Sequence, residues 1–340
     1  MDQSAIKKIS PLGFVWETSD PFLFCVHHLD TFPKGNEQLG PAASLAGRDI
    51  GQDFTPNDGW RMYHGETVPG FPAHPHRGFE TVTVVLDGFV DHTDSAGAAG
   101  RYGIGDVQWM TAGSGLQHAE MFPLLNSDQP NRMELFQIWL NLPGARKMVR
   151  PFYKMLWAEE MAQVVVQDDQ ARTTRITMIA GELNGTKAIP PAPDSWAADP
   201  GHELAIWIIQ MQPGAEWDLP AAGTSVKRSL FFFEGSSLQI DGSKIPMDSA
   251  VVLDAERGVL LQAGPDPVRL LLLQAKPIGE PVTQYGPFVM NTEQEIYKAY
   301  SDFRRDQFGG WPWNRSDPVH PRSQARFARY ADGTEETRAR

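Results

Sequence analysis

Cysteine is almost absent from this sequence. Cys25 is the one cysteine among 340 residues, so no disulfide can form within the chain and nothing requires an oxidising compartment. Basic residues are also scarce, because Lys and Arg number 30 against 42 Asp and Glu, and the formal net charge is −12. Surfaces that bind DNA are built from clustered Lys and Arg, so we expect no direct contact with nucleic acid.

Long apolar runs are missing as well. The N-terminal residues MDQSAIKKISPLGF contain no apolar core of the kind that a signal peptide has. The longest apolar runs, such as residues 251–253 and 270–273, are far too short to cross a bilayer. We therefore expect a soluble, cytoplasmic monomer that does not associate with a membrane.

Turn-forming residues and short apolar segments dominate what is present. The 31 Gly and 27 Pro suit a fold with many tight turns. Several short segments are rich in β-branched and aromatic residues and are bounded by Gly, Pro, Asn or Asp. They cover residues 80–88, 135–143, 203–211, 229–235 and 268–275. This pattern is typical of strands in a sandwich or barrel, and it predicts an all-β fold with a few short helices.

Helical periodicity is convincing only over residues 292–308. Ile296, Tyr300 and Phe303 fall on one face of a helix drawn there. Thr292 followed by Glu295 fits a capping box at its start. The sequence therefore predicts one amphipathic helix close to the C-terminus.

The two halves of the chain are alike in outline. VVLDG followed by GRYGIGDVQWMTAG in the first half corresponds to FFFEG followed by LQIDGSKIPMDSAVVLDAERG in the second. A duplicated β-barrel produces such a repeat. With the join at the turn of residues 141–144, we predict an N-terminal metal-binding barrel over residues 1–143 and a C-terminal barrel over residues 144–310. Residues 311–340 are polar and are expected to form a peripheral tail.

Four side chains form a candidate metal site. His74 and His76 stand at positions i and i+2, and so do His118 and Glu120. Residues two apart on a strand point to the same face, so both pairs on neighbouring antiparallel strands would place four donors together. Three imidazoles and one carboxylate suit Fe(II), Mn(II), Ni(II), Cu(II) or Zn(II) rather than Ca(II) or Mg(II). We expect one such ion per chain, with Fe(II) as our first choice although the donor types by themselves leave all five metals open.

The remaining histidines have a simpler interpretation. A lone histidine in a strand is usually a packed or surface residue. We give that interpretation to the six histidines outside the two pairs, which are His27, His28, His64, His92, His202 and His320.

Two long segments resemble the pirin family within the cupin superfamily. They are HPHRGFETVTVVLDGFVDHTDSAGAAGRYGIGDVQWMTAGSGLQHAEM, residues 74–121, and GEPVTQYGPFVMNTEQEIYKAYSDFRRDQFG, residues 279–309. The resemblance implies two tandem cupin barrels with a mononuclear metal in the first, held by His74, His76, His118 and Glu120. Glu80 sits where many other cupins have a ligand glutamate, but in the pirin pattern Glu120 takes that role. We therefore leave Glu80 outside the ligand set.

The second barrel departs from the metal-binding pattern. Its corresponding strand, PGAEWDLPAAGTSVKRSLFFFEG, contains no histidine, and His202 is the only histidine between His118 and His320. One histidine cannot rebuild a three-histidine site, so we expect this barrel to be metal-free and to stabilise the first.

Residues beside the ligands have open interpretations. Arg77 is expected to pair with Glu80 or with an anionic substrate, and a plain surface salt bridge fits equally well. We expect Gln117 to be structural. Four large side chains either line a pocket or belong to the barrel core, which is the simpler expectation for each. They are Phe79, Phe89, Trp109 and Met110.

The resemblance implies two functions of different kinds. Several bacterial pirins are similar to quercetin 2,3-dioxygenases, which implies an oxidoreductase that opens flavonols such as quercetin with O2 and uses Glu120 as ligand and catalytic base. Pirins also act without catalysis, which implies an iron-binding, redox-responsive protein that regulates a transcription regulator or a metabolic enzyme. A metal-dependent isomerase or hydrolase is a third option, because cupin sites host many reactions.

Overall fold

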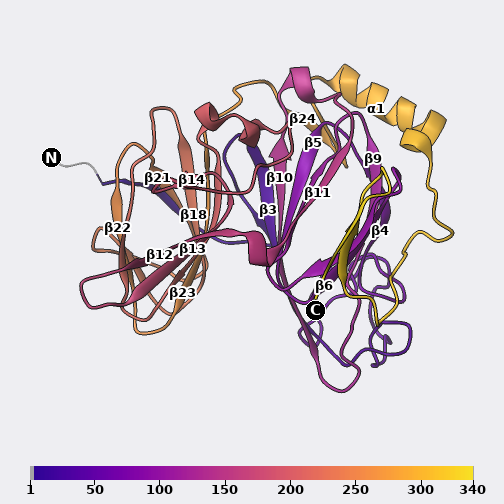
Figure 1. The fold of residues 1–340 in the computed structure, drawn as a ribbon, viewed down its shortest axis with the longest axis horizontal. Coiled ribbons are helices and arrows are strands. Elements are labelled where there is room, and N and C mark those ends of the chain that lie inside the picture. The colour runs from indigo at the N-terminus through magenta and orange to yellow at the C-terminus, as the bar shows by residue number, and fades with distance from the viewer. Residues whose placement is uncertain (1–3, 340) are drawn as a thin grey trace. The chain divides into compact units, whose positions relative to one another are not determined.

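The structure, a computed structural model, describes residues 4–339 and is built mainly from antiparallel strands (Figure 1). The expected all-β class is therefore confirmed. The five strands expected from the sequence are also present: they are β5 (Phe79–Asp87), β10 (Asn131–Asn141), β16 (Ala205–Met211), β18 (Lys227–Glu234) and β23 (Val268–Ala275). None of the helices within residues 4–339 has the length and apolar character needed to span a bilayer.

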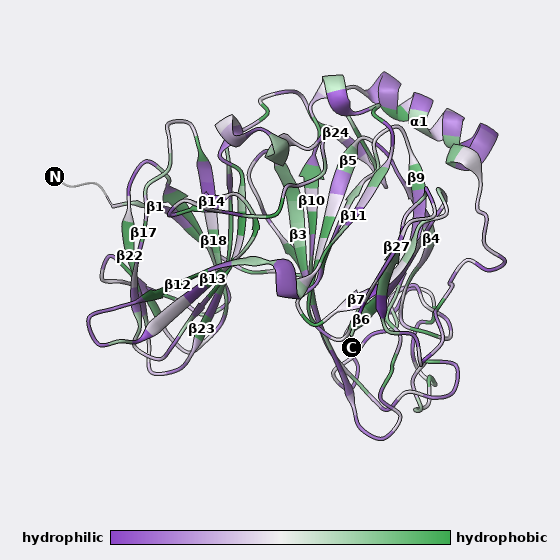
Figure 2. Ribbon diagram, viewed as in Figure 1, coloured by the Kyte–Doolittle hydropathy of each residue, from purple (hydrophilic) through white to green (hydrophobic). Residues whose placement is uncertain are grey.

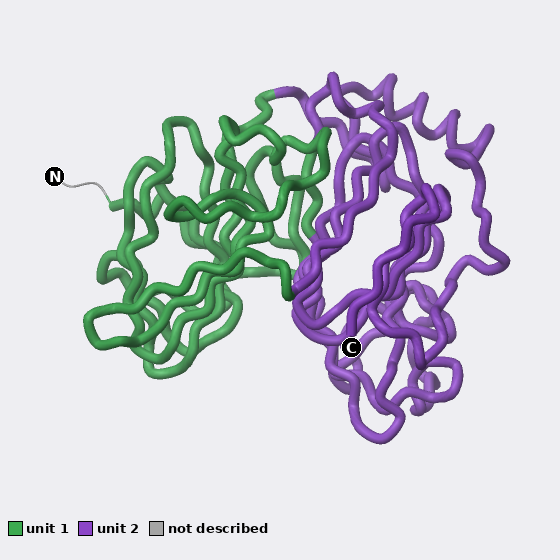
Figure 3. Tube along the Cα trace, in the orientation of Figure 1, with its two compact units in different colours: residues 1–26, 138–141, 159–279 green, residues 27–137, 142–158, 280–340 purple. Residues whose placement is uncertain are grey.

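The chain divides into two compact units that are interleaved along the sequence. Unit 1 comprises residues 1–26, 138–141 and 159–279, and unit 2 comprises residues 27–137, 142–158 and 280–340 (Figure 3). The chain passes from one unit to the other inside β3 (Phe22–Phe32) and near the end of β10. The linear boundaries expected at residues 143 and 310 do not coincide with this division.

Unit 1 is organised around one large antiparallel sheet and one small one. The large sheet has seven strands in the order β1-β21-β18-β23-β16-β13-β12, and the small one has four in the order β17-β22-β19-β20. The strands not yet given are β1 (Ile6–Pro11), β12 (Ala162–Gln167), β13 (Thr173–Ala180), β17 (Glu216–Leu219), β19 (Leu238–Ile240), β20 (Ser243–Ile245), β21 (Ser249–Asp254) and β22 (Val259–Ala263). Their inward residues, among them Ile209, Leu230 and Leu272, form one buried cluster.

Two six-stranded sheets account for most of the remaining strands. Their orders are β11-β8-β5-β10-β3-β2 and β27-β26-β7-β6-β9-β4. The new strands of the first are β2 (Val15–Trp16), β8 (Val107–Thr111) and β11 (Phe152–Leu156). Those of the second are β4 (Gly70–His76), β6 (Phe89–Asp94), β7 (Ala99–Gly103), β9 (Leu116–Met121), β26 (Arg326–Arg329) and β27 (Glu335–Arg338).

Two small hairpins and the helices complete the fold. The hairpins are β14 (Glu182–Leu183) with β15 (Thr186–Lys187) and β24 (Thr283–Tyr285) with β25 (Phe288–Met290). Five short 3-10 helices are η1 (Gly144–Arg146), η2 (Ala158–Glu160), η3 (Trp196–Ala198), η4 (Pro200–His202) and η5 (Gln307–Gly309).

The predicted amphipathic helix is confirmed as α1 (Glu293–Asp306). Thr292 and Glu295 form the expected capping box, which satisfies backbone N–H groups at the first turn. Ile296 is buried, and Tyr300 and Phe303 pack with it against Phe288 of β25. Figure 2 shows that α1 carries both hydrophilic and hydrophobic residues, as this one-sided packing requires.

Within the segment expected as a peripheral tail, residues 326–338 supply the two outermost strands of the sheet that contains β4. Strand β26 pairs with β7, and β27 pairs with β26. Arg326 of β26 forms a 2.7 Å ion pair with Asp106, whose side chain is fully buried. Composition alone hid this role, because a short polar strand at a sheet edge lacks the apolar alternation that marks inner strands.

Candidate metal centre

Neighbouring strands β4 and β9 of unit 2 bring the predicted residues together. The strands are antiparallel, and His74 lies directly opposite His118. Gly113 and Gly115, in the turn before β9, have φ values of +49° and +133°, which favour glycine. Four strands, β5 to β8, separate β4 from β9 in the sequence.

Three imidazoles converge on one point. His74, His76 and His118 each offer a ring nitrogen, and these three atoms lie within 4.8 Å of one another. The ring centroid of His118 lies 4.5 Å from that of His74 and 5.0 Å from that of His76. Such a set of neutral imidazole donors could hold a transition metal ion.

Backbone carbonyl groups orient two of the rings. His74 Nδ1 lies 2.8 Å from the oxygen of Pro72, and His76 Nδ1 lies 3.3 Å from the oxygen of Pro287. A carbonyl oxygen can only accept, so each Nδ1 carries the proton and each Nε2 presents its lone pair. Ligand histidines in metalloproteins are commonly held in this way. The carbonyl of Pro72 is available because β4 has an irregularity in register between Phe71 and His74.

His118 provides the test of whether a metal fits. Its side chain is fully buried, yet neither ring nitrogen has a hydrogen-bond partner among residues 4–339. A buried polar atom without a partner is costly, and coordination to a cation removes that cost. Burial lowers the pKa of His118 well below its usual value, and the neighbouring His74 and His76 lower it further. Burial also lowers the pKa values of His74 and His76, so all three rings are neutral, as ligands must be.

Glu120 lies beside this cluster. Its Oε2 is 3.6 Å from His118 Nε2, but no carboxylate oxygen belongs to the group of atoms that lie within 4.8 Å of one another. Thr83 donates a 3.2 Å hydrogen bond to Oε1 of Glu120, and Gln137 donates to both carboxylate oxygens at 3.2 and 3.0 Å. The carboxylate is therefore held at the edge of the imidazole cluster by two neutral donors.

Sequence reasoning missed Gln137 and Thr83, whereas His92 is a packed residue, as expected. His92 of β6 is fully buried, lies opposite Glu120, and has its ring centroid 5.6 Å from that of His118. The sequence places Thr83 in the same predicted strand as Glu80, but it does not indicate which side chain of another strand Thr83 contacts. Thr83 and Gln137 lie in one six-stranded sheet and Glu120 in the other, so these hydrogen bonds join two sheets and only the tertiary structure reveals them.

The other predicted neighbours of the ligands fall outside the cluster. Arg77 does not pair with Glu80: its NH1 group donates at 2.8 Å to Asp302 of α1, and the guanidinium carbon lies 4.3 Å from the centre of the Phe308 ring. Glu80 accepts a 2.7 Å hydrogen bond from Thr111. The side chain of Gln117 donates to the carbonyl oxygens of residues 307 and 310, which is the structural role expected of it.

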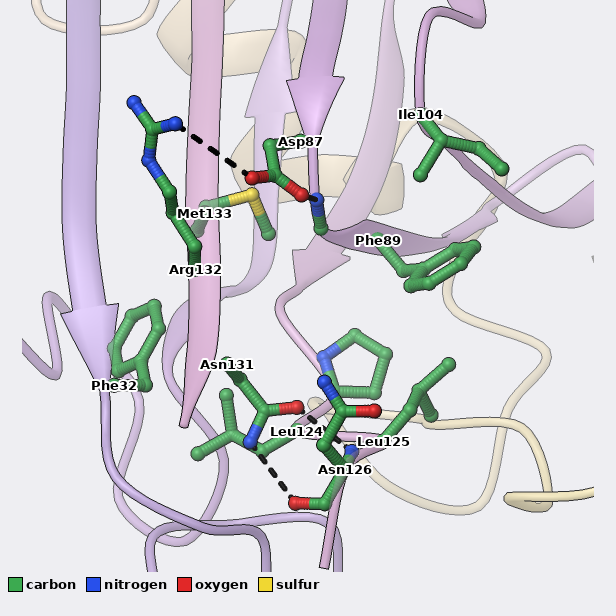
Figure 4. A pocket seen from close by; sticks show the side chains of 12 residues that line it. Phe32, Asp87, Phe89, Ile104, Leu124, Leu125, Asn126, Asn131, Arg132 and Met133 are labelled. Atoms are coloured by element: carbon green, nitrogen blue, oxygen red, sulfur yellow. Dashed lines mark hydrogen bonds and ion pairs between the residues drawn. The ribbon is translucent and has the colours of Figure 1, made fainter. Parts of the chain in front are cut away.

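Three of the four large side chains considered for a pocket are core residues, because Phe79, Trp109 and Met110 are fully buried. Phe89 lines a cavity of about 80 Å³ beside the turn between β5 and β6 (Figure 4). None of the four candidate ligand residues lines that cavity. Ligand pockets are usually about 300 Å³ or larger, so this one is too small for a flavonol.

Comparison with known families matches both halves of the chain. Residues 47–140 match the family model described as pirin, and residues 206–309 match the pirin C-terminal cupin domain. The first match contains all four candidate ligand residues, and the second contains α1.

Curated relatives and a crystal structure agree with these matches. The chain is 36% identical over 241 residues to the Pseudomonas aeruginosa protein named "Putative quercetin 2,3-dioxygenase PA2418", covering 70% of this chain and 79% of that protein. It is also 36% identical to a pirin-like protein of Solanum lycopersicum, covering 71% and 77% of the two chains. A crystal structure of quercetin 2,3-dioxygenase from Acinetobacter baumannii matches with a TM-score of 0.68 and 25% identity, covering 90% of this chain and 98% of that one.

Proposed function

The chain belongs to the pirin family, and we propose that it is a metal-dependent dioxygenase that opens flavonols such as quercetin with O2. The observation that carries the proposal is the convergence of His74, His76 and His118 next to an oriented carboxylate, with both ring nitrogens of His118 unsatisfied. A purely structural cluster would be expected to satisfy those nitrogens within the chain.

The proposed ligands are the Nε2 atoms of His74 and His76, one nitrogen of His118 and the carboxylate of Glu120. A bound divalent transition metal would supply a Lewis acid for the flavonol hydroxyl group and a redox centre for O2. We propose Fe(II) for this position, and the donor set also suits Mn, Ni, Cu and Zn.

Glu120 is the proposed proton acceptor. A flavonol must lose its hydroxyl proton to become reactive toward O2, and we propose that a carboxylate oxygen of Glu120 accepts that proton. The hydrogen bonds from Thr83 and Gln137 fix the orientation of the carboxylate before substrate enters. Burial keeps competing water away from it, since only 3% of Glu120 is exposed.

The relatives support this choice of substrate class. Two Pseudomonas aeruginosa proteins, 36% and 35% identical to this chain, are named "Putative quercetin 2,3-dioxygenase". Quercetin is therefore the first substrate to test.

The test is aerobic consumption of quercetin, followed as loss of its absorbance, together with elemental analysis of protein purified without added metal. We expect about one metal ion per chain and turnover by the wild type. His118→Ala should lose both metal and turnover, whereas His202→Ala, a matched control in unit 1, should retain both. Equal turnover by His118→Ala would rule out the assigned site.

The non-enzymatic alternative predicts a different result from the same experiment. A wild-type protein that binds one iron ion per chain and consumes no quercetin would exclude the dioxygenase. That result would support an iron-binding, redox-responsive protein that regulates a protein partner.

A further inference from the structure

Unit 1 contains a cavity of about 590 Å³ that the proposed function does not use. The cavity is lined by residues around the β14–β15 hairpin, by the segment that follows it, and by Arg228 of β18 and Gln274 of β23. Its volume is within the range of small-molecule sites in proteins. None of the four candidate metal ligands lines it.

Arg228 brings a positive charge to the wall of this cavity. Strand alternation places it on the same face of β18 as Leu230 and Phe232, which belong to the core of unit 1, so the side chain points inward. Only 1% of Arg228 is exposed. Its Nε donates a 2.8 Å hydrogen bond to Oε1 of Gln274.

The rest of the guanidinium lacks an acceptor. The NH1 nitrogen of Arg228 is buried without a hydrogen-bond partner among the residues that the structure describes, and none of their carboxylates forms an ion pair with it. Burial lowers the pKa of Arg228 to about 10, which still leaves the group protonated at neutral pH. A water molecule would satisfy the hydrogen bond, but it would not balance the charge.

Glu203, the carboxylate whose charge acts on Arg228, already has other partners. Glu203 also lines the cavity, but its Oε2 accepts a 2.7 Å hydrogen bond from the backbone of Gly223, and its Oε1 lies 3.0 Å from Nζ of Lys276. At the rim, Glu182 lies 3.6 Å from Lys187, and Asp199 accepts a hydrogen bond from the backbone of Gly201. The positive charge of Arg228 is therefore buried and is not balanced by any of these carboxylates.

The remaining wall is largely apolar. Leu183, Ile189, Pro190, Leu204, Trp207 and Pro220 contribute to it. A ligand with an apolar body would bury that surface, and a single negative group would reach Arg228. The single positive charge of Arg228 matches a monoanion. A phosphate dianion would bring a second negative charge close to Glu203, and Lys187, the other cation of the lining, already lies 3.6 Å from Glu182.

We propose that this cavity binds a small organic carboxylate, with the carboxylate on Arg228 and the apolar body against Trp207 and Leu204. Gln274 holds the guanidinium in the orientation that presents NH1 to the ligand. The site is separate from the proposed metal centre and belongs to the barrel that we expect to be metal-free.

Calorimetric titration of the full chain with 4-phenylbutyrate tests the proposal. We expect binding at millimolar concentration or tighter, and about 10- to 100-fold weaker binding of the neutral 4-phenylbutanamide, because the charge-assisted hydrogen bond is lost. Phenyl phosphate should bind more weakly than the carboxylate. Tighter binding of the phosphate, or equal binding of the amide, would overturn the assignment.

Variants of Arg228, measured for both binding and Tm, distinguish a loss of ligand binding from a loss of folding. Arg228→Met should lose binding by the same factor without lowering Tm, since a buried unpaired charge is replaced by an apolar side chain of similar length. Arg228→Lys should restore part of the affinity. His118→Ala should bind 4-phenylbutyrate as the wild type does. Loss of binding in His118→Ala but not in Arg228→Met would place the acid at the metal centre and refute the proposal.

Discussion

The three imidazoles of the candidate metal centre differ in what their second nitrogen contacts. Carbonyl oxygens fix the protonated nitrogen of His74 and of His76, whereas His118 has no such partner among residues 4–339. Two of the candidate ligands are therefore pre-oriented by the backbone, and the third is held by packing alone. Glu120 is oriented by Gln137 and Thr83 instead. Backbone carbonyl groups and the side chains of Gln137 and Thr83 therefore orient the candidate ligands together.

Gln137 provides a direct test of that arrangement. Gln137→Leu removes the hydrogen bonds to both oxygens of Glu120, and we expect metal affinity or quercetin turnover to fall about 10- to 100-fold. Metal titration and steady-state kinetics measure the two effects separately. Gln284→Leu, an exposed glutamine of β24, should change neither. Unchanged metal binding and turnover in Gln137→Leu would show that Glu120 needs no such support.

Asp302 determines a pH dependence of stability. It accepts hydrogen bonds from Arg77 at 2.8 Å, Lys298 at 2.9 Å and Arg305 at 2.8 Å. The bond from Arg77, followed by that from Lys298, holds the pKa of Asp302 well below its usual range. A carboxyl group with a depressed pKa in the folded state stabilises the fold above its unfolded pKa, and this contribution is lost as the pH falls toward the folded pKa.

Asp302→Asn should therefore lower the free energy of unfolding by about 2 kcal/mol at pH 7. The difference from the wild type should shrink as the pH falls below about 4, the usual value for an aspartate in an unfolded chain. Urea unfolding at pH 7 and at pH 3 measures both quantities. Asp266→Asn, at an exposed loop position, is the control. A difference that stays constant with pH would contradict this role.

Among the strands, β26, which lies between β7 and the edge strand β27, carries a buried charge. Arg326 donates at 2.7 Å to Asp106, and Asp106 also accepts hydrogen bonds from the backbone of Gly103 and Ala158. Arg101 of the adjacent β7 pairs with Asp91 and donates to carbonyl oxygens of residues 320, 321 and 324. The segment from residue 311 onward is therefore fastened to the sheet that holds β4 and β9.

The same strand contains a matched pair for measuring this contribution. Arg326→Ala leaves Asp106 buried without its cation and should cost about 3 kcal/mol, the lower end for a broken buried pair because two backbone donors remain. Arg329 lies 3.5 Å from Glu335 with both side chains nearly half exposed, so Arg329→Ala should cost less than about 1 kcal/mol. Urea unfolding of both variants measures the two losses in the free energy of unfolding. Equal losses in the two variants would mean that the buried Arg326–Asp106 pair stabilises the fold no more than the exposed Arg329–Glu335 pair does.

Over the full chain, the interleaving of the two units limits how the protein can be divided. Unit 2 needs β11, which pairs with β8 of the first half, and it needs α1, whose Asp302 meets Arg77. A fragment of residues 1–143 lacks these segments and leaves the charge of Arg77 without its carboxylate partner.

We therefore expect the fragment of residues 1–143 to give no cooperative unfolding transition and no stoichiometric metal binding. Near-UV circular dichroism during urea titration, together with elemental analysis, tests this against the full chain. A fragment that unfolds cooperatively and binds one metal ion would show that residues 1–143 form an independent domain after all.

Features that depend on a few consecutive residues were predictable. The capping box of Thr292 and Glu295 marks the start of α1, and strand alternation places His74 with His76, and His118 with Glu120, on common faces. Both rest on backbone periodicity, which operates within one element and leaves its mark on the sequence.

Features that join distant elements had to come from the folded chain. Arg77 meets Asp302 across 225 positions, and Arg326 meets Asp106 across 220. Thr83 and Gln137 contact Glu120 although β5 and β10 belong to a different sheet from β9. Strand adjacency is chosen by the packing of the whole core and by the closure of long loops, and no local pattern records that choice. Short-range periodicity thus specified which side chains could act together, and long-range packing specified which of them do.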